Sequence, residues 1–359
     1  MLDGKWVAAR HGFGSGWSPS AFHRHALMAA GPVAPAPSPP TAPSVAVVIC
    51  AYTEARWEEL VAAVDSIKTQ TVPVSQCVVV IDHNTSLFHR SLAHLEGVEV
   101  TENAEKQGLA GARNTGVAMC HCDVVAFLDD DAVAASDWIE HLVRPYEDRA
   151  IQGTGGFARP NWVGGEPGWF PEEFYWVVGC SYRGLPESVG PVRNPIGAAM
   201  SFRTSVFDRV GGFDTDMGRF GSVPLGCEET VMGIRVSQHF GAGTILHVPD
   251  AIVDHKVGAE RSNLRYFVRR CFAEGISKAA VAARVGRSDG SSAERRYVTS
   301  VLPHGVVAGV SRAARGDTVG LTTALAILLG LGATVVGYAI GMMGLSQRVT
   351  TWLVGRSNG

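Results

Sequence analysis

Short apolar, β-branched runs alternate with amphipathic stretches from Val45 onward, and this alternation constrains the fold of the 359-residue chain most strongly. The runs VAVVICA, QCVVVID and VEVTE are accompanied by helical patterns such as WEELVAAVDSIKTQ and LAGARNTGVAMCH. Continuous β-branched runs separated by helices are typical of parallel strands that are covered on both faces. The sequence therefore predicts an α/β, Rossmann-like fold with a mostly parallel sheet and helices on both faces.

Acidic residues follow two of the predicted strands. Asp82 ends the run VVVID, and Asp129, Asp130 and Asp131 end the run in DVVAFLDDDA. Ligands of open α/β sheets collect at this carboxyl edge. One interpretation of the three aspartates is a Mg²⁺ or Mn²⁺ site, since adjacent carboxylates repel one another unless a cation offsets them. The alternatives are a solvated acidic turn for the three and an Asx-turn for Asp82.

Further candidates lie in the second half of the chain. Glu228 and Glu229 begin an apparent helix, where a carboxylate suits the positive end of the helix dipole. The functional interpretation is a general base that takes a proton from an acceptor hydroxyl. His255 follows a predicted strand in AIVDHKVG and is either a further metal ligand or a structural histidine. The residues alone leave both choices open.

Residues 318–343, TVGLTTALAILLGLGATVVGYAIGMM, carry no charged side chain. A bilayer core needs about 20 apolar residues, so this run is long enough to span a membrane; a buried soluble helix is the alternative. Gly330, Gly337 and Gly341 would let it pack closely on another helix. A basic helix precedes it and suits work beside anionic lipid. The basic residues assigned to that helix are Arg261, Arg265, Arg269, Arg270 and Lys278.

Charge and cysteine content argue against several classes of protein. The formal net charge of -3 provides no basic field, so no nucleic-acid partner is expected. The seven cysteines contain no CxxC pair and are interpreted as reduced thiols of a cytosolic domain. The cluster Cys120-His121-Cys122 is a weak zinc pattern without a distant partner pair. Residues 1–30 lack a continuous apolar core, so no secretory signal is expected.

Seven segments occur in the order found in the family 2 glycosyltransferases, which the chain resembles over roughly residues 45–256. They are VAVVICAYTEA, VVVIDHNTS, QGLAGARNTG, FLDDDA, GAAMSFRTSVFDRVGGFD, GCEETVMGIR and VDH. The resemblance implies a GT-A fold, a nucleotide-sugar donor, Mg²⁺ or Mn²⁺ as cofactor, and one displacement with inversion at the anomeric carbon.

The resemblance also implies roles in donor binding. Tyr52 and Glu54 would line the nucleotide pocket after the first strand, and Asp82 would contact the base. Arg113 would lie close to the nucleotide. Asp129, the first residue of the family's DxD motif, would lie nearer the ribose and also belong to the metal site.

The remaining implied roles concern the metal and the chemistry. Asp131 would be the direct metal ligand, and His255 would complete the metal and diphosphate site. The family's Glu-Asp pair is Glu228-Glu229 here, so the catalytic base is Glu229 by alignment, with Glu228 as the other choice. The Gln-x-x-Arg-Trp motif of processive synthases is absent after Glu229, which favours a single addition.

Four other residues are linked to the acceptor side with less specificity. Asp214, in the GGFD segment, would help to shape the acceptor pocket. Trp162, Trp169 and Trp176 either stack on a sugar or lipid or pack in the core.

We predict five segments in the chain. They are an N-terminal extension with a Pro/Ala-rich linker (1–44), a GT-A catalytic domain (45–290), a juxtamembrane helical region (291–317), a transmembrane segment (318–344) and a tail (345–359). Because activated sugars are cytosolic, we expect a single-pass membrane protein with a cytoplasmic catalytic domain. Its acceptor is expected to be a hydroxyl group of a polyprenyl-phosphate-linked or other cell-envelope molecule, or the lipid phosphate itself.

Two other classes were weighed. A noncatalytic, membrane-tethered sugar- or nucleotide-binding module is the alternative function. A nucleotidyltransferase is disfavoured, because such enzymes usually have a Gly-rich, basic loop after the first strand and the loop here is AYTEARWEE.

Overall fold

The structure, a computed structural model, describes residues 42–217, 226–286 and 292–344. Residues from Ala42 onward belong to one compact unit. Most of the predicted extension and linker (1–44), and all of the predicted tail (345–359), lie outside the described residues.

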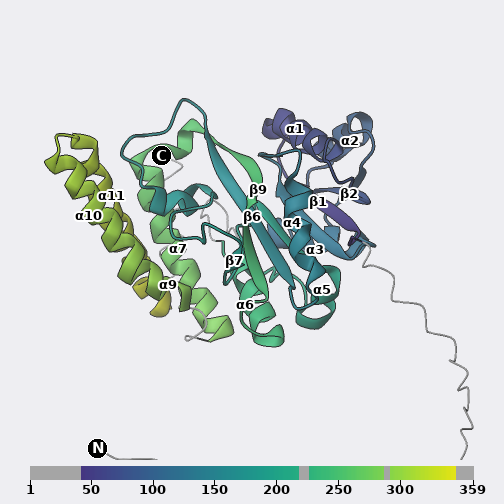
Figure 1. Cartoon of the computed structure of the whole chain (residues 1–359). Helices are drawn as coiled ribbons and strands as arrows, with labels where there is room; N and C mark the ends of the chain where they lie inside the picture. Colours follow the sequence, from purple (N-terminus) through teal and green to yellow (C-terminus); the bar gives the residue numbers. More distant parts are fainter. Residues whose placement is uncertain (1–41, 218–225, 287–291, 345–359) are drawn as a thin grey trace, which may run out of the picture. The chain divides into compact units, whose positions relative to one another are not determined.

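A nine-stranded sheet runs through the described part of the chain (Figure 1), in the order β3-β2-β1-β4-β8-β6-β9-β5, with β7 paired to β9. Its strands are β1 (Val45–Ala51), β2 (Gln76–Ile81), β3 (Glu99–Glu102), β4 (Val124–Asp129), β5 (Ala132–Ala134), β6 (Gly153–Trp162), β7 (Gly190–Pro191), β8 (Ala199–Arg203) and β9 (Ile245–Val257).

Most strands of the sheet point the same way, β6 and β9 included, and β5, β7 and β8 run in the opposite direction. β1 is parallel to β2 and β4, and β2 is parallel to β3, as the sequence predicts. β8 is antiparallel to β4 and β6, while β5 and β7 are antiparallel to β9. The α/β class is confirmed with a mixed sheet, because an apolar run predicts a buried strand without specifying its direction.

Helices follow most of the strands. The α-helices are α1 (Trp57–Lys68), α2 (Thr85–His94), α3 (Leu109–Met119), α4 (Trp138–Val143), α5 (Thr204–Val210), α6 (Glu228–Phe240), α7 (Leu264–Val285), α9 (Ser292–Arg296), α10 (Leu302–Ala314) and α11 (Thr318–Met342). Shorter turns are η1 (Glu54–Arg56), η2 (Arg144–Glu147), η3 (Glu172–Val178), η4 (Ala259–Arg261) and the π-helical η5 (Tyr297–Val301).

The two faces of the sheet contact separate cores, as β1 shows. Val47 and Ile49 are buried in a cluster that includes side chains of α1 and α4. Ala46 and Val48 belong to a second cluster with side chains of α3 and α6. Side chains of a strand point alternately to opposite faces, so a run that is apolar throughout is buried on both.

One central strand, β6, was not predicted. Its sequence, GTGGFARPNW, is rich in glycine and lacks the β-branched pattern of the predicted strands. A Cβ atom on Gly156 would lie 2.2 Å from the carbonyl oxygen of Ala251, and one on Gly155 would lie 2.4 Å from Pro195 Cβ. These glycines allow close contact between neighbouring segments, a requirement that strand propensity does not capture.

The long helices α7 and α11 pack side by side with their backbones in contact. A Cβ atom on Gly337 of α11 would lie 2.1 Å from Phe272 O, and one on Gly275 of α7 would lie 2.1 Å from Thr334 O. Gly330 and Gly341 of α11 also face side chains of α7. The predicted close packing of these glycines on another helix is therefore confirmed, and the partner is α7.

The opposite face of α11 is apolar and exposed. The helix has 25 residues and a mean hydropathy of 2.1 in its most apolar window, so it is long and apolar enough to cross a membrane. Leu321, Leu325 and Leu328 are each about half exposed. The helix thus has one face on the protein and one face without protein contacts among the described residues.

We expect Gly337→Val to destabilise the protein by about 1–3 kcal/mol, because a side chain there overpacks the α7–α11 contact. The matched control is Gly332→Val on the same helix, where a Cβ atom meets nothing within 4 Å. The stability of both variants is measured as the midpoint of thermal unfolding in detergent. Equal unfolding midpoints for the two variants would contradict the close contact.

Candidate active site

A cavity of about 690 Å³ lies at the carboxyl ends of β1, β2 and β4. Most of the predicted site residues line it: Tyr52, Asp82, Arg113, Asp129, Asp131, Glu228, Glu229 and His255. Glu54 is exposed in η1 and is not among the lining residues. The cavity continues away from the sheet to side chains of α7, η5, α10 and α11.

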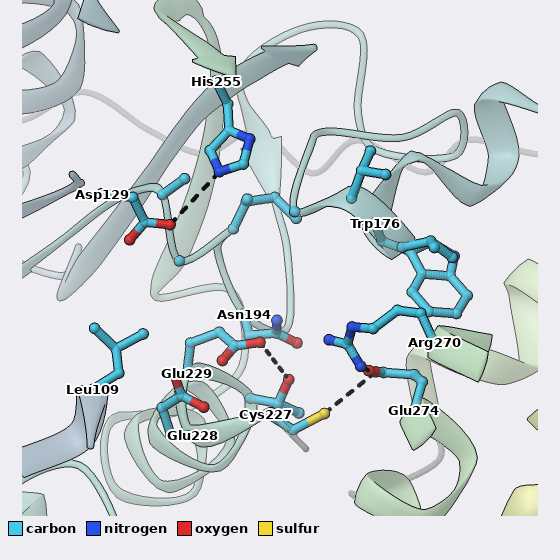
Figure 2. Close-up of a pocket in the computed structure, with 18 of the residues that line it drawn as sticks. Leu109, Asp129, Trp176, Asn194, Cys227, Glu228, Glu229, His255, Arg270 and Glu274 are labelled. Atoms are coloured by element: carbon cyan, nitrogen blue, oxygen red, sulfur yellow. Dashed lines mark hydrogen bonds and ion pairs between the residues drawn. The ribbon is translucent and has the colours of Figure 1, made fainter. Parts of the chain in front are cut away.

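Asp129, Asp131 and His255 form a candidate metal site. Each offers one ligand atom, and these atoms lie within 4.8 Å of one another. His255 Nε2 is 3.2 Å from Asp131 Oδ1 and 3.9 Å from Asp129 Oδ2, the second of which Figure 2 shows as a dashed line. Antiparallel pairing of β5 with β9 places His255 opposite Ala132, directly after the aspartates. Two carboxylates and an imidazole suit a divalent cation such as Mn²⁺.

The central carboxyl, Asp130, is held differently from its two neighbours. Arg56 Nη1 donates to Asp130 Oδ1 at 2.8 Å and lies 3.1 Å from Asp131 Oδ2. Burial raises the pKa of Asp130 to about 7, although Arg56 opposes this shift. Its hydrogen bond to Arg56 and its burial keep Asp130 out of the candidate metal group, which contains Asp129, Asp131 and His255.

Positive side chains surround Asp131. Burial alone would raise the pKa of this carboxyl, but His255, Arg56 and Arg261 outweigh it and hold the pKa well below its usual range. Burial would lower the pKa of His255, but Asp131 and Cys180 raise it well above its usual value. Cys180 Sγ lies 3.7 Å from His255 Nδ1, which leaves Nε2 directed at the aspartates.

Arg113 connects the candidate metal site to the acids of α6. This side chain is buried, and its Nη1 donates to Glu228 Oε1 at 3.0 Å. Its Nη2 lies 3.4 Å from Asp129 Oδ1 and donates to the carbonyl oxygen of Gly197 at 3.2 Å. The two acid clusters therefore share one buried cation.

The two glutamates of α6 differ in their environment. Glu228 is paired with Arg113, whereas Glu229 accepts from Thr230 Oγ1 at 3.5 Å, a weak contact. Burial and the neighbouring Glu228 carboxylate raise the pKa of Glu229 to about 7. A carboxyl that exchanges its proton near neutral pH suits general base catalysis.

This pKa predicts a pH dependence. If deprotonated Glu229 is required, kcat/KM will rise with pH, reach half its plateau near pH 7, and be low where the carboxyl is protonated. Initial rates between pH 5 and pH 9, measured with saturating metal, test this. A flat profile through pH 7 would contradict it.

Asp82 is held by distant partners. Its Oδ1 accepts from Asn103 Nδ2 at 2.7 Å, and its Oδ2 accepts from the backbone N–H of Gly108 at 3.0 Å. These bonds tie the end of β2 to the segment before α3. The carboxyl and the exposed ring of Tyr52 line the same part of the cavity.

The structure separates the less specific candidates. Trp176 lines the cavity, whereas Trp162 and Trp169 pack against Phe170 in the core beneath α11. Asp214 is not among the lining residues, and its Oδ2 accepts from Arg284 Nε at 2.9 Å.

Several lining residues were missed or misplaced by the sequence analysis. Arg56 follows β1 in AYTEAR, a basic position that the motif interpretation passed over. Arg261 lies in η4 and not in the basic helix, which begins at Leu264. Arg193, Glu274 and Glu294 had no motif that could have identified them.

The fold and the cavity define a metal-site glycosyltransferase of the GT-A class. The chain belongs to Glycosyl transferase family 2, whose sequence profile matches residues 46–211. The glucosyl-dolichyl phosphate glucuronosyltransferase of Haloferax volcanii is 38% identical over 238 residues, which cover 65% of this chain and 76% of that protein.

Two more comparisons agree with the class. The pre-mycofactocin glycosyltransferase of Mycobacterium tuberculosis is 31% identical over 199 residues, covering 54% of this chain and 38% of that protein. The mannosyltransferase PcManGT from Pyrobaculum calidifontis, solved with GDP-Man and Mn²⁺, superimposes with a TM-score of 0.52. That alignment has 19% identity and covers 83% of this chain and 89% of that one, so it supports the fold.

All seven cysteines lie in the described residues, and all are free thiols. Cys120, His121 and Cys122 form no candidate metal group there.

Proposed function

We propose that this glycosyltransferase moves a sugar from a nucleoside diphosphate sugar to a hydroxyl group of a polyprenyl-phosphate-linked acceptor. The observation that carries the proposal is one cavity that holds both the Asp129–Asp131–His255 group and the acid Glu229. Donor and acceptor chemistry can therefore meet in one enclosed space.

We assign donor binding and metal binding to separate residues of the cavity. Tyr52 and Asp82 contact the nucleotide, and Arg113 lies where it attracts the diphosphate. Asp129, Asp131 and His255 would hold Mn²⁺ or Mg²⁺, which would supply positive charge to the departing diphosphate.

Glu229 accepts the proton of the acceptor hydroxyl. The acceptor oxygen then forms a bond to the anomeric carbon while the bond from that carbon to the diphosphate oxygen breaks. The electron pair of the broken bond leaves with the nucleoside diphosphate. Attack from the side opposite the leaving group inverts the anomeric centre, and no covalent enzyme intermediate is required.

The acceptor proposal is supported by the archaeal relative and by α11. That relative, from Haloferax volcanii, is a glucosyl-dolichyl phosphate glucuronosyltransferase. We infer that the acceptor here is also a sugar on a polyprenyl phosphate, and a nucleotide glucuronate is the first donor to test. The absence of the Gln-x-x-Arg-Trp motif supports a single addition.

We also propose that α11 crosses the membrane once and that the catalytic domain faces the cytoplasm. The exposed leucines of α11 support membrane contact. In intact cells the domain should be protected from added protease and should become sensitive on lysis. Cleavage in intact cells would contradict this orientation.

The test of the function uses the purified, detergent-solubilised protein and a panel of nucleotide sugars. With Mn²⁺ or Mg²⁺ present, one donor should be slowly hydrolysed without acceptor, and nucleoside diphosphate release should increase when the glucosyl lipid phosphate is added. A binding module would bind the donor without releasing nucleoside diphosphate. That outcome would favour the noncatalytic alternative.

A further inference from the structure

The end of the cavity away from the sheet contains five charged side chains in an alternating chain. Arg193 Nη1 lies 2.6 Å from Glu294 Oε2, and Glu294 Oε1 lies 2.6 Å from Lys278 Nζ. Lys278 Nζ is also 3.5 Å from Glu274 Oε1, whose other oxygen is 3.2 Å from Arg270 Nη1. All five side chains line the cavity and are at most 23% exposed.

Three cations and two carboxylates leave this group with a formal charge of one positive. Burial would raise the pKa of Glu294, but Lys278 and Arg193 lower it to about 2. Burial would also raise the pKa of Glu274, but Lys278 and Arg270 hold it below its usual value. Both carboxylates are therefore ionised at neutral pH, and so are their cationic partners.

Among the residues that the structure describes, the other lining groups near these cations are neutral. Tyr182 and Tyr297 are neutral phenols, since burial raises the pKa of both. Cys227 is a neutral thiol, because burial raises its pKa well above the usual value. Glu229 also lines the cavity, and burial and the Glu228 carboxylate raise its pKa to about 7. Excess positive charge in a partly desolvated space favours an anionic ligand.

The five charged side chains lie close both to the acids of α6 and to the apolar helix α11. Cys227 precedes the acids of α6, and its Sγ donates to Glu274 Oε1 at 3.3 Å. In Figure 2 Cys227 lies between Glu229 and the Arg270–Glu274 pair. Leu331 and Thr334 of α11 line the same cavity, and α11 packs along α7, the helix that carries Arg270 and Lys278. The cations therefore share one cavity with the proposed base and the apolar helix.

We propose that Arg193, Arg270 and Lys278 bind the phosphate that joins the acceptor sugar to its lipid. This inference rests on the proposed function. The sugar then lies between the phosphate and Glu229, and the lipid chain leaves past Leu331 of α11 toward the membrane. Glu294 bridges two of the cations, so it competes with the phosphate and sets its affinity.

The placement selects among acceptors. A polyprenyl phosphate without a sugar reaches the cations but leaves the space beside Glu229 empty, so it binds without accepting. A free sugar has no group for the cations and binds weakly. Inorganic phosphate interacts only with the charges of the three cations. It binds more weakly than a lipid phosphate, because it has no lipid chain to contact α11.

Binding is measured first, by calorimetry on the full-length protein in detergent without donor. The probes are glucosyl farnesyl phosphate, farnesyl phosphate, methyl glucoside and inorganic phosphate. Lys278→Gln is expected to weaken binding of the glucosyl farnesyl phosphate at least tenfold. The control Arg269→Gln removes an exposed cation of the same helix that does not line the cavity, and should change binding less than twofold.

The direction in which each substitution changes the affinity for lipid phosphate distinguishes a phosphate site from an ion network that is only structural. Glu294→Gln removes a competing carboxylate and should tighten binding of the lipid phosphates severalfold, whereas Lys278→Gln should weaken it. Weaker binding in both variants, or no change in either, would overturn the inference. Tighter binding of inorganic phosphate than of farnesyl phosphate would show a free-anion site and also overturn it.

Donor hydrolysis without acceptor keeps the two proposals separate. Lys278→Gln should show a raised KM for the lipid acceptor, whereas the control Arg269→Gln should keep both this KM and the rate of donor hydrolysis within twofold of wild type. If the wild-type protein binds the glucosyl lipid phosphate but hydrolyses no donor, the proposed function fails and the phosphate site stands. If donor hydrolysis is normal and the lipid does not bind, the phosphate site fails alone.

Discussion

Replacing Asp131 with asparagine is expected to reduce the transfer rate at least about 10³-fold, equivalent to about 4 kcal/mol at about 1.36 kcal/mol per tenfold. The carboxylate offers one of the three ligand atoms and also lies against His255, Arg56 and Arg261. Asparagine is similar in size but supplies no charge to balance a divalent cation or these side chains. Transfer rate and Mn²⁺ affinity should therefore fall together.

The readouts are nucleoside diphosphate release and Mn²⁺ binding, the latter by calorimetry on the same preparation. Asp208→Asn, an exposed carboxylate of α5, serves as the control and should change neither. A chelator added to the wild-type protein should reproduce the loss of rate. Full activity in Asp131→Asn, or in wild type with chelator, would refute the metal site.

Glu229→Gln is expected to lower kcat by about 10²–10⁴-fold, the range typical of general base catalysis, while Mn²⁺ affinity and unfolding temperature stay near wild type. Glutamine keeps the shape of the side chain but cannot accept a proton. The rise in kcat/KM near pH 7 should disappear with the residue that causes it. Residual turnover should be independent of pH across that range.

Glu228→Gln is the informative comparison. Its carboxylate pairs with the buried Arg113, so losing that charge should destabilise the protein by about 3–5 kcal/mol. Glu187→Gln, an exposed residue, is the neutral control. If Glu228→Gln loses the pH-dependent step while Glu229→Gln keeps it, the assignment of the base must be reversed.

The sequence predicted the elements with regular periodicity well. β1, β2 and β4 and the helices between them follow from apolar runs and amphipathic spacing, and both depend on neighbours in the chain. Strand β6 could not be predicted in this way, because its glycines are required by contacts with segments that are far away in the sequence. The direction of β8 was also unpredictable from its composition.

The candidate site shows the same division. Asp129, Asp131 and Glu229 lie in contiguous motifs, so the ordered resemblance located them. Arg193 and Glu294 come from segments separated by about one hundred residues and meet only through the fold. Their pairing depends on the packing of α9 against the catalytic domain, which leaves no periodic signal in the sequence.

The contact between α7 and α11 has a practical consequence for anyone who wishes to shorten this protein. Deleting the chain from Thr318 onward would remove Ile327 from the core that contains Phe174 and Phe267, and would remove Leu331 from the cavity wall. The apolar helix is thus a component of the catalytic body and not an interchangeable tether. A chimera that carries an unrelated anchor would lack the glycine surface that fits α7, so attachment to a bilayer alone would not restore a complete enzyme.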